Sequence, residues 1–214
     1  ETNRLLICTD TIDDVLVRRL GTRWVLVGDD FRFGKERAGD LAVLRRCART
    51  FSVEAMASVD ISGERVSSTA VRDALARGDL RRAADLLGHP FTIGGRVIHG
   101  DKRGRTLGIP TANIALCGPG ALRGIFAVRV HGLGDAPRNG VASIGVRPTI
   151  AAGAKPLLEV YIFDFDESIY GQRIRVEFVH KLRDEARYDS LDALAKQIHA
   201  DVAQARDWFS TQVH

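Results

Sequence analysis

The stretch GGRVIHGDKRGRTLGIPTAN, residues 94–113, is rich in glycine and basic residues and poor in the apolar residues that build a core. Its glycines allow positive φ angles and let the backbone approach a ligand closely. Successive backbone N–H groups in such a loop can bind an anion, and Lys102, Arg103 and Arg105 would strengthen the binding. Composition alone leaves two interpretations open, a loop that binds nucleotide phosphates or a glycine-rich surface hairpin with solvated charges.

The end of this stretch offers oxygen ligands. Thr111 carries a hydroxyl and Asn113 an amide, both of a type that Mg²⁺ accepts, and residues Pro110 to Asn113 are predicted to form a turn. A Walker A loop is excluded, because the glycines from Gly100 to Gly108 are not followed by Lys-Ser or Lys-Thr and are expected to lie between strands.

The chain after residue 90 shows short apolar segments that turn residues separate. This pattern predicts an antiparallel sheet or a small barrel. A final helix is expected to begin near Ser190 and to cover the barrel with an apolar face. The predicted strands are residues 91–98, 125–130, 141–146, 158–165 and 174–179, and the predicted apolar face comprises Leu191, Leu194, Ile198, Val202, Ala205 and Phe209.

The chain before residue 90 instead alternates between strand and helix patterns. Strands at residues 5–8, 24–27 and 53–59, with helices that begin near Thr11 and Leu41, predict a doubly wound, Rossmann-like parallel sheet. Ligands bind at the carboxyl ends of the strands in such sheets, so the segment that follows the second strand is a candidate site.

Two further helices lead to the predicted domain boundary. Ser67 and Ser68 are natural N-cap residues for the first helix, while Asp79 caps the second and Gly88 ends it. The serines are typical of an ordinary helix start; the alternative is a phosphate site at the helix N-terminus, with Arg72 one turn into the helix. The predicted domains are residues 1–88 and 89–214.

The composition of the whole chain argues against several classes of protein. The chain has 214 residues, of which 45% are apolar. Its formal net charge of +4 is mild and supports nucleic-acid binding only weakly, and small anionic substrates fit the charge equally well. No run approaches the roughly 18 apolar residues of a membrane span, and no secretory signal is visible. The three cysteines lie far apart and predict no disulfide framework. We expect a cytoplasmic protein that binds neither membranes nor nucleic acid.

Glu159 is the candidate catalytic residue of the second domain. It lies in a predicted strand, where alternation directs its carboxylate away from the face that carries Leu158 and Val160. If that face lines the mouth of the barrel, Glu159 could accept a proton from a substrate hydroxyl. If the face is solvated, Glu159 is an ordinary exposed glutamate.

The order of these motifs resembles a known family. Gly94, Val97, His99 and Gly100, followed by Arg103-Gly104-Arg105 and by Leu107-Gly108-x-Pro110-Thr111-Ala112-Asn113, look like the signature of riboflavin kinases. The resemblance extends over about residues 88–210 through these further pieces: Gly124-Ile125-Phe126-Ala127, Asn139 to Thr149, Glu159-Val160-Tyr161, Tyr170-Gly171, and Lys181 to Tyr188. Val27 to Gly34 and Ser67 to Arg72 are similar to two motifs of bacterial FMN adenylyltransferase modules. Together the chain resembles the bacterial bifunctional riboflavin kinase/FMN adenylyltransferases.

The resemblance implies a kinase that uses ATP and Mg²⁺ to convert riboflavin to FMN. It implies that Glu159 is the catalytic base, that Thr111 and Asn113 bind Mg²⁺, and that a flap holds the flavin. The residues implied at the ATP phosphates are Gly94, His99, Gly100, Arg103, Gly104, Arg105, Gly108, Thr111 and Asn113, and those at the flavin are Arg183, Glu185 and Arg187.

For the first domain the resemblance implies a second step, in which another ATP adenylylates FMN to FAD. The implied site comprises Asp29, Asp30 and Phe31 near the adenosine, and Ser67, Ser68, Thr69 and Arg72 at the phosphates. The family also needs an early Gly-x-Phe-Asp-Gly-x-His-x-Gly-His element, yet no histidine precedes His89 here. We therefore expect the N-terminal part of the adenylyltransferase module to be missing from this chain.

Two other functions remain open from the sequence. One is a riboflavin kinase whose degenerate first domain only regulates. The other is a non-enzymatic barrel that binds oligonucleotides, which would be expected to interleave aromatic residues with its basic residues. The second domain has few aromatic residues in such positions, so this alternative is weaker.

Overall fold

The computed structural model describes residues 9–100, 108–118, 120–145 and 156–212. By its internal contacts the chain divides into two compact units, Glu1–Arg65 and Val66–His214.

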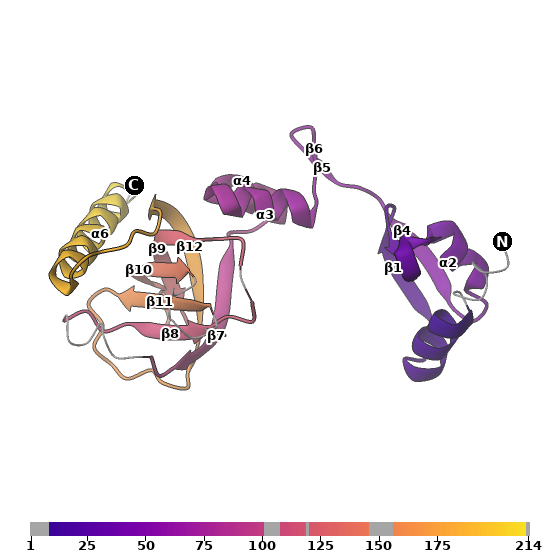
Figure 1. The fold of residues 1–214 in the computed structure, drawn as a ribbon, viewed down its shortest axis with the longest axis horizontal. Helices are drawn as coiled ribbons and strands as arrows, with labels where there is room; N and C mark the ends of the chain where they lie inside the picture. Colours follow the sequence, from indigo (N-terminus) through magenta and orange to yellow (C-terminus); the bar gives the residue numbers. More distant parts are fainter. Residues whose placement is uncertain (1–8, 101–107, 119, 146–155, 213–214) are drawn as a thin grey trace. The chain divides into compact units, whose positions relative to one another are not determined.

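The first unit contains the parallel strand pair that the sequence predicts. Strands β1 (Trp24–Gly28) and β4 (Ser52–Met56) run parallel, with Trp24 opposite Ser52. A π-helix, η1 (Thr9–Arg19), and helix α2 (Leu41–Cys47) contribute to the core of this unit, and Figure 1 shows α2 near β1 and β4. The core is formed by Ile12, Val43, Leu44 and Phe51, and the short elements are β2 (Arg32–Phe33), η2 (Lys35–Arg37), β3 (Gly39–Asp40), β5 (Asp60–Ile61) and β6 (Glu64–Arg65).

Three details of this unit bear on the predictions. The strand predicted at residues 5–8 lies outside the described residues. The strand predicted at 53–59 ends at Met56. Cys47 is disulfide-bonded, although the cysteine spacing had predicted no such bond.

The second unit begins with two capped helices, α3 (Ser68–Arg77) and α4 (Leu80–Leu87). The Ser67 and Asp79 side chains accept backbone N–H groups at the two helix starts, and Gly78 and Gly88 end the helices in the left-handed conformation. These are the caps that the sequence predicts, and glycine is favoured there because it has no Cβ.

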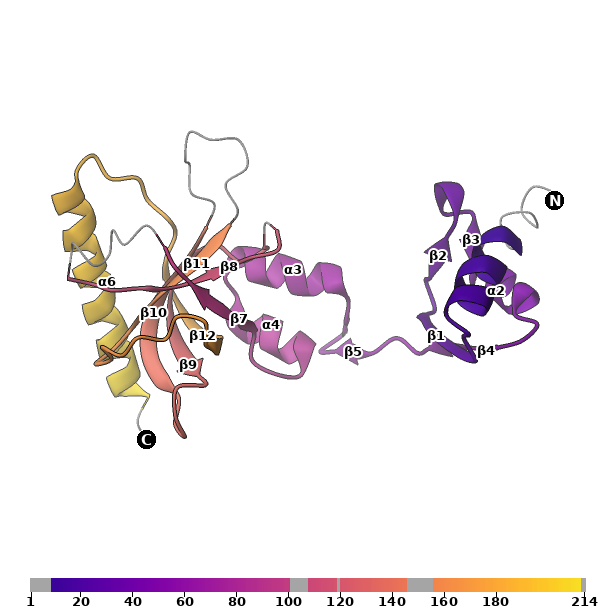
Figure 2. The same cartoon turned by 90° about the horizontal axis from the view of Figure 1, so that it is seen from below.

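A closed barrel of strands forms the rest of the second unit, in the order β10-β11-β8-β7-β12-β9. Helix α6 (Leu191–Thr211) runs along one side of it, with Ser190 as its N-cap (Figures 1 and 2). This confirms the predicted antiparallel barrel with a C-terminal helix. The strands are β7 (Thr92–Ile98), β8 (Ala112–Ala115), β9 (Gly124–His131), β10 (Arg138–Gly145), β11 (Leu157–Ile162) and β12 (Arg173–Arg183).

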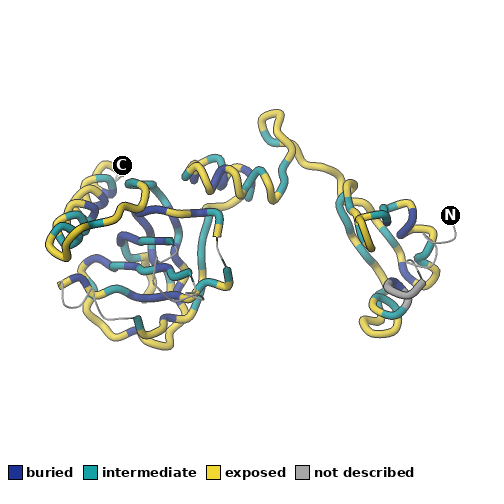
Figure 3. Tube along the Cα trace, viewed as in Figure 1, coloured by how far each residue is buried: buried dark blue, intermediate teal, exposed yellow. Residues whose placement is uncertain are grey.

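Alternation along the strands separates an inner from an outer layer. Inward side chains such as Phe126, Leu158 and Val160 are fully buried, and burying such a side chain contributes about 1.5–3 kcal/mol. Outward side chains under α6, such as Ala127 and Phe163, form a second cluster with Ala205 and Phe209 of the helix. Figure 3 shows how the buried residues gather in the barrel strands and along one side of α6.

Strand β8 is the barrel strand that the sequence did not predict. The residues from Pro110 to Asn113 were expected to form a turn, but Ala112 and Asn113 belong to β8, which pairs with β7 and β11. Proline and asparagine favour turns in isolation. The two neighbouring strands override that local preference because each offers backbone groups to pair with.

The domain boundary at residues 88/89 stays a prediction. Helices α3 and α4 share one hydrophobic cluster with the barrel interior, through Ala74, Leu75, Leu80 and Ala83. Within the described parts of the chain, no helix is both long enough and apolar enough to cross a membrane.

Candidate functional site

Three polar residues lie side by side across the outer face of the barrel. Glu159 of β11 is in register with Asn113 of β8 on one side and with Ser143 of β10 on the other. Its strand neighbours Leu158 and Val160 are fully buried in the interior, while Glu159 itself is half-buried. Alternation therefore directs the carboxylate outward, as predicted, and the barrel register places it between an amide and a hydroxyl.

Asn113 is held in a tight environment. Its side chain is only 5% exposed, and its Nδ2 donates a hydrogen bond of 3.0 Å to the carbonyl of Thr111. Among the described residues its Oδ1 has no hydrogen-bond partner, although buried acceptors normally have one. Gly100 lies against the amide, and a Cβ at that position would come within 2.5 to 2.7 Å of its atoms. The site thus requires glycine at position 100 and offers a buried acceptor at position 113.

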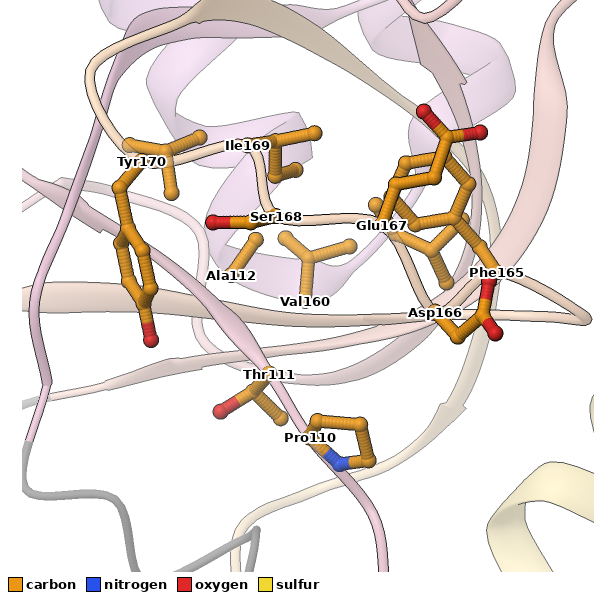
Figure 4. Close-up of a pocket in the computed structure, with 12 residues that line it drawn as sticks. Pro110, Thr111, Ala112, Val160, Phe165, Asp166, Glu167, Ser168, Ile169 and Tyr170 are labelled. Carbon is orange, nitrogen blue, oxygen red and sulfur yellow. The ribbon is translucent and has the colours of Figure 1, made fainter.

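A cavity of about 120 Å³ opens beside Thr111. Its floor is apolar and includes Val97, Ala112 and Val160 from the barrel interior. The loop between β11 and β12, from Phe165 to Tyr170, forms the opposite wall, and Figure 4 shows the Tyr170 ring and the Thr111 hydroxyl at the same side of the space. A cavity with an apolar floor and a few polar groups at its rim is typical of a small-molecule site.

His99 borders this region. Its ring stacks on that of Tyr170, with the ring centroids 3.9 Å apart. This contact brings the residue that precedes Gly100 next to the wall of the cavity. From the sequence, Tyr170 was only part of a motif and had no predicted role.

The glycine-rich stretch is partly described. Arg103, Gly104 and Arg105 lie outside the described residues. Gly108 has a φ of 73°, a conformation that favours glycine. Gly94 lies inside β7, opposite Arg175 of β12, so its backbone belongs to the barrel. The phosphate-binding role predicted for these residues, Gly94 included, stays a prediction.

Of the three predicted flavin residues, Arg183 is the last residue of β12, and Glu185 and Arg187 follow it. Arg183 donates to both carboxylate oxygens of Asp201 in α6, over 2.7 and 2.6 Å. This pairing raises the pKa of Arg183. The Glu185 carboxylate presses against Gly145 of β10, where a Cβ would overlap it, and burial raises the pKa of Glu185. Arg187 is exposed. The chain after β12 thus lies against the strand that also carries Ser143.

The predicted adenylyltransferase residues divide between the two units. In the first unit, Asp29 accepts hydrogen bonds from Ser58 and Arg65, and these partners, Ser58 above all, lower the pKa of Asp29. Asp30 lies 3.5 Å from Arg65, and the Phe31 ring stacks on that of Phe33.

The other four residues of that prediction lie at the start of α3, in the second unit. The Ser67 hydroxyl accepts the backbone N–H of Ala70 over 3.1 Å. Ser68, Thr69 and Arg72 occupy the first turns of the helix. The ordinary capping interpretation of Ser67 is therefore correct, and a phosphate role for the group stays a prediction.

Sequence reasoning missed Asp201. It lies on the buried face of α6 and is only 2% exposed, whereas the predicted apolar residue Leu191 is 66% exposed. A charged residue inside an apolar helical stripe was the available signal, because buried carboxylates are almost always paired.

Comparison with known families agrees with this geometry. The family model for riboflavin kinase matches residues 87–209, more than half of the chain. The chain belongs to the riboflavin kinase family. The model for FAD synthetase matches residues 6–70, which confirms the predicted order of a nucleotidyltransferase segment followed by a riboflavin kinase barrel.

Curated relatives show the same pairing of modules. The chain is 46% identical over 203 residues to the bifunctional riboflavin kinase/FMN adenylyltransferase of Haemophilus influenzae, covering 94% of this chain and 66% of that protein. The protein of the same name from Pseudomonas fluorescens is 46% identical over 214 residues, covering 99% and 68%. The chain thus spans about two thirds of the length of these relatives.

A solved structure shares the fold. It is titled a macrolide-efflux protein from Streptococcus pneumoniae, and it is 30% identical to this chain with a TM-score of 0.64. The match covers 92% of this chain and 64% of that one.

Proposed function

We propose that the barrel transfers the terminal phosphoryl group of ATP to the ribityl 5′-hydroxyl of riboflavin, which yields FMN. The observation that carries the proposal is the cross-strand pair of Asn113 and Glu159 next to the Thr111 cavity. Membership of the riboflavin kinase family supports it. Phosphoryl transfer depends mainly on positioning and charge neutralisation, so a small constellation of this kind is sufficient.

Glu159 is the proposed general base. It is half-buried on the outer face, between Asn113 and Ser143, so a substrate hydroxyl on that face comes within its reach. A carboxylate that accepts the hydroxyl proton during transfer contributes about 10²–10⁴-fold to the rate. Leu158 and Val160, packed on either side in the barrel, fix the position of its backbone.

The residues present fit Mg²⁺, which takes oxygen ligands. Asn113 offers a buried Oδ1 without a partner among the described residues, and Thr111 adds a hydroxyl two positions earlier. These two residues would hold the ion. When bound, it would neutralise charge on the ATP phosphates.

The nucleotide is proposed to place its base in the cavity beside Thr111. The apolar floor, together with the rim residues Ser168 and Tyr170, suits a flat heterocycle with polar edges. The phosphates would then run past Thr111 toward Gly100 and Gly108. Arg103, Gly104 and Arg105 are also proposed to bind the ATP phosphates.

Riboflavin is proposed to lie on the outer barrel face beside Glu159. The chain that follows β12 lies against β10 at Gly145, close to Ser143, and so borders that face. Arg183, Glu185 and Arg187 belong to this border.

FMN adenylylation is a second candidate function. The match of the FAD synthetase model to residues 6–70 favours it, as do the names of the relatives. Asp29, Asp30, Phe31, Ser67, Ser68, Thr69 and Arg72 are the residues proposed to serve it. Formation of FAD from FMN and ATP by this chain is the direct test.

To test the kinase proposal, the purified chain is incubated with riboflavin and MgATP, and the products are separated by chromatography. We expect FMN, and we expect Glu159→Gln to lower its rate by about 10²–10⁴-fold. Glu177→Gln is the matched control, because Glu177 lies on β12 and pairs with His131 at 2.8 Å, away from the site. Wild-type turnover by Glu159→Gln would overturn the proposal. Binding of single-stranded DNA without any FMN would favour the oligonucleotide-binding alternative.

A further inference from the structure

Asp201 is a buried carboxylate whose oxygens are both engaged. Its Oδ1 accepts from Nε of Arg183 at 2.7 Å and from Nε2 of Gln197 at 2.9 Å, and its Oδ2 accepts from a terminal guanidinium nitrogen of Arg183 at 2.6 Å. The paired side chains are 3% and 22% exposed. Two parallel charge-assisted bonds to a planar guanidinium fix its orientation as well as its position.

Arg183 stands on the same row of the barrel as the proposed base. It is in register with Ile125 of β9, which is in register with Ser143 of β10, which in turn is in register with Glu159. Arg183 is also the last residue of β12, so its orientation sets the direction in which the chain leaves the barrel.

The chain that leaves the barrel is tied to this arginine. The remaining terminal nitrogen of Arg183 donates to the carbonyl of Asp184 at 2.9 Å, and its guanidinium lies 5.9 Å from the ring centroid of Tyr188. Lys181 pairs with Asp184 at 2.7 Å. The segment from Asp184 to Asp189, here called the exit segment, therefore depends on Arg183 at both ends.

We propose that Asp201 is a positioning residue for riboflavin phosphorylation. Through Arg183 it holds the exit segment at the border of the outer face on which Glu159 lies, and so it shapes the flavin side of the site without contacting substrate. This inference rests on the function proposed above. It assigns a role to α6 beyond covering the barrel.

A purely structural role for Asp201 makes a different prediction. Helix α6 has other attachments to the barrel: Ala205 and Phe209 are buried in the outer cluster, and Arg206 pairs with Asp164 at 2.8 Å while lying over the Phe163 ring. Loss of Asp201 should therefore leave α6 docked. The exit segment has no comparable second anchor to α6 among the contacts of the described residues.

The first variant is Asp201→Asn in the full chain, assayed for FMN formation with riboflavin and ATP varied separately. We expect KM for riboflavin to rise at least 10-fold, while KM for ATP stays within about twofold, since the cavity beside Thr111 is untouched. Asp207→Asn is the matched control, being an exposed aspartate on the same helix, and should behave as wild type. Equal changes in both KM values, or none, would overturn the proposal.

Asp201→Asn leaves the Arg183 charge without its partner, and that alone can unfold a chain. The double variant Asp201→Asn/Arg183→Gln removes both charges and keeps the protein testable. We expect it to regain the wild-type melting temperature but to keep the raised KM for riboflavin. If the double variant recovers both the melting temperature and the KM for riboflavin, Asp201 serves only to neutralise the buried charge of Arg183. If the wild-type chain makes no FMN at all, the proposed function fails, which is distinguishable from a failure of this inference.

Discussion

Asn113 and Glu159 face each other across the neighbouring strands β8 and β11 of the barrel, although 46 positions separate them in the sequence. One contributes a buried acceptor and the other a half-buried carboxylate. The pairing places a candidate metal ligand beside a candidate base.

Asn113→Ala should abolish most kinase activity while leaving the fold intact. The change removes the unpartnered Oδ1 and one hydrogen bond to Thr111, a bond worth about 0.5–1.5 kcal/mol to stability. We expect kcat to fall by about 10²–10³-fold, as when an electrostatic group of an active site is lost. Asn139→Ala on β10 is the control. Steady-state rates measure kcat, and thermal melts test whether the fold is intact. An unchanged kcat would contradict the role given to Asn113.

Thr111→Val keeps the shape of the side chain but removes its hydroxyl. We expect the Mg²⁺ concentration for half-maximal rate to rise and kcat to fall by about 10²-fold, more than for loss of any single arginine of the loop. Thr92→Val, on β7, should leave both values unchanged. The measurement is a Mg²⁺ titration of FMN formation. A normal Mg²⁺ dependence in Thr111→Val would remove this residue from the metal site.

Gly100→Ala should impair activity through Asn113. A Cβ at position 100 would come within 2.7 Å of the amide oxygen and nitrogen of Asn113, so that side chain must move. We expect a loss of activity comparable to that of Asn113→Ala. Gly118→Ala provides the control, because a Cβ there would meet no atom within 4 Å. Equal turnover of the two alanine variants would show that the contact at Gly100 is unimportant.

Gly145→Ala should displace the exit segment, because the new Cβ would overlap the Glu185 carboxylate. We expect a higher KM for riboflavin with little change in KM for ATP. Shortening the other partner relieves the overlap, so Gly145→Ala/Glu185→Ala should recover part of the affinity relative to Gly145→Ala alone. A double-mutant cycle with no coupling between the two positions would contradict this account.

Glu185 should make stability depend on pH in a direction opposite to that of Asp164. Burial raises the pKa of Glu185 above its usual 4.5, so its ionisation lowers the free energy of unfolding as pH rises through that raised value. The hydrogen bond from Arg206 lowers the pKa of Asp164 from 3.8, so its ionisation raises stability over a lower pH range.

Urea unfolding of Glu185→Gln and Asp164→Asn at about pH 3 and about pH 7 tests both signs. Relative to wild type, Glu185→Gln should gain stability between the two pH values, and Asp164→Asn should lose it. The same sign for both variants would contradict the assignment.

Helix ends were predictable because their causes are local. Ser67, Asp79 and Ser190 cap helices with their own side chains, and Gly78 and Gly88 end helices because they lack a Cβ. Strand alternation likewise predicts that the Glu159 side chain points to the face opposite its two core neighbours, Leu158 and Val160. None of these features needs a partner from elsewhere in the chain.

The sequence by itself determined the succession of a parallel α/β segment and an antiparallel barrel, the motifs that resemble riboflavin kinases, and the outward direction of Glu159. Tertiary structure decided that Ala112 and Asn113 form a strand, since only pairing with β7 and β11 overrides the turn preference of that tetrapeptide. It also decided that Asp201 is buried, because Arg183 arrives from another strand to neutralise it. Contacts between distant segments arise only when the barrel closes, which brings Gly100 against Asn113, Asn113 beside Glu159, and Arg183 against Asp201.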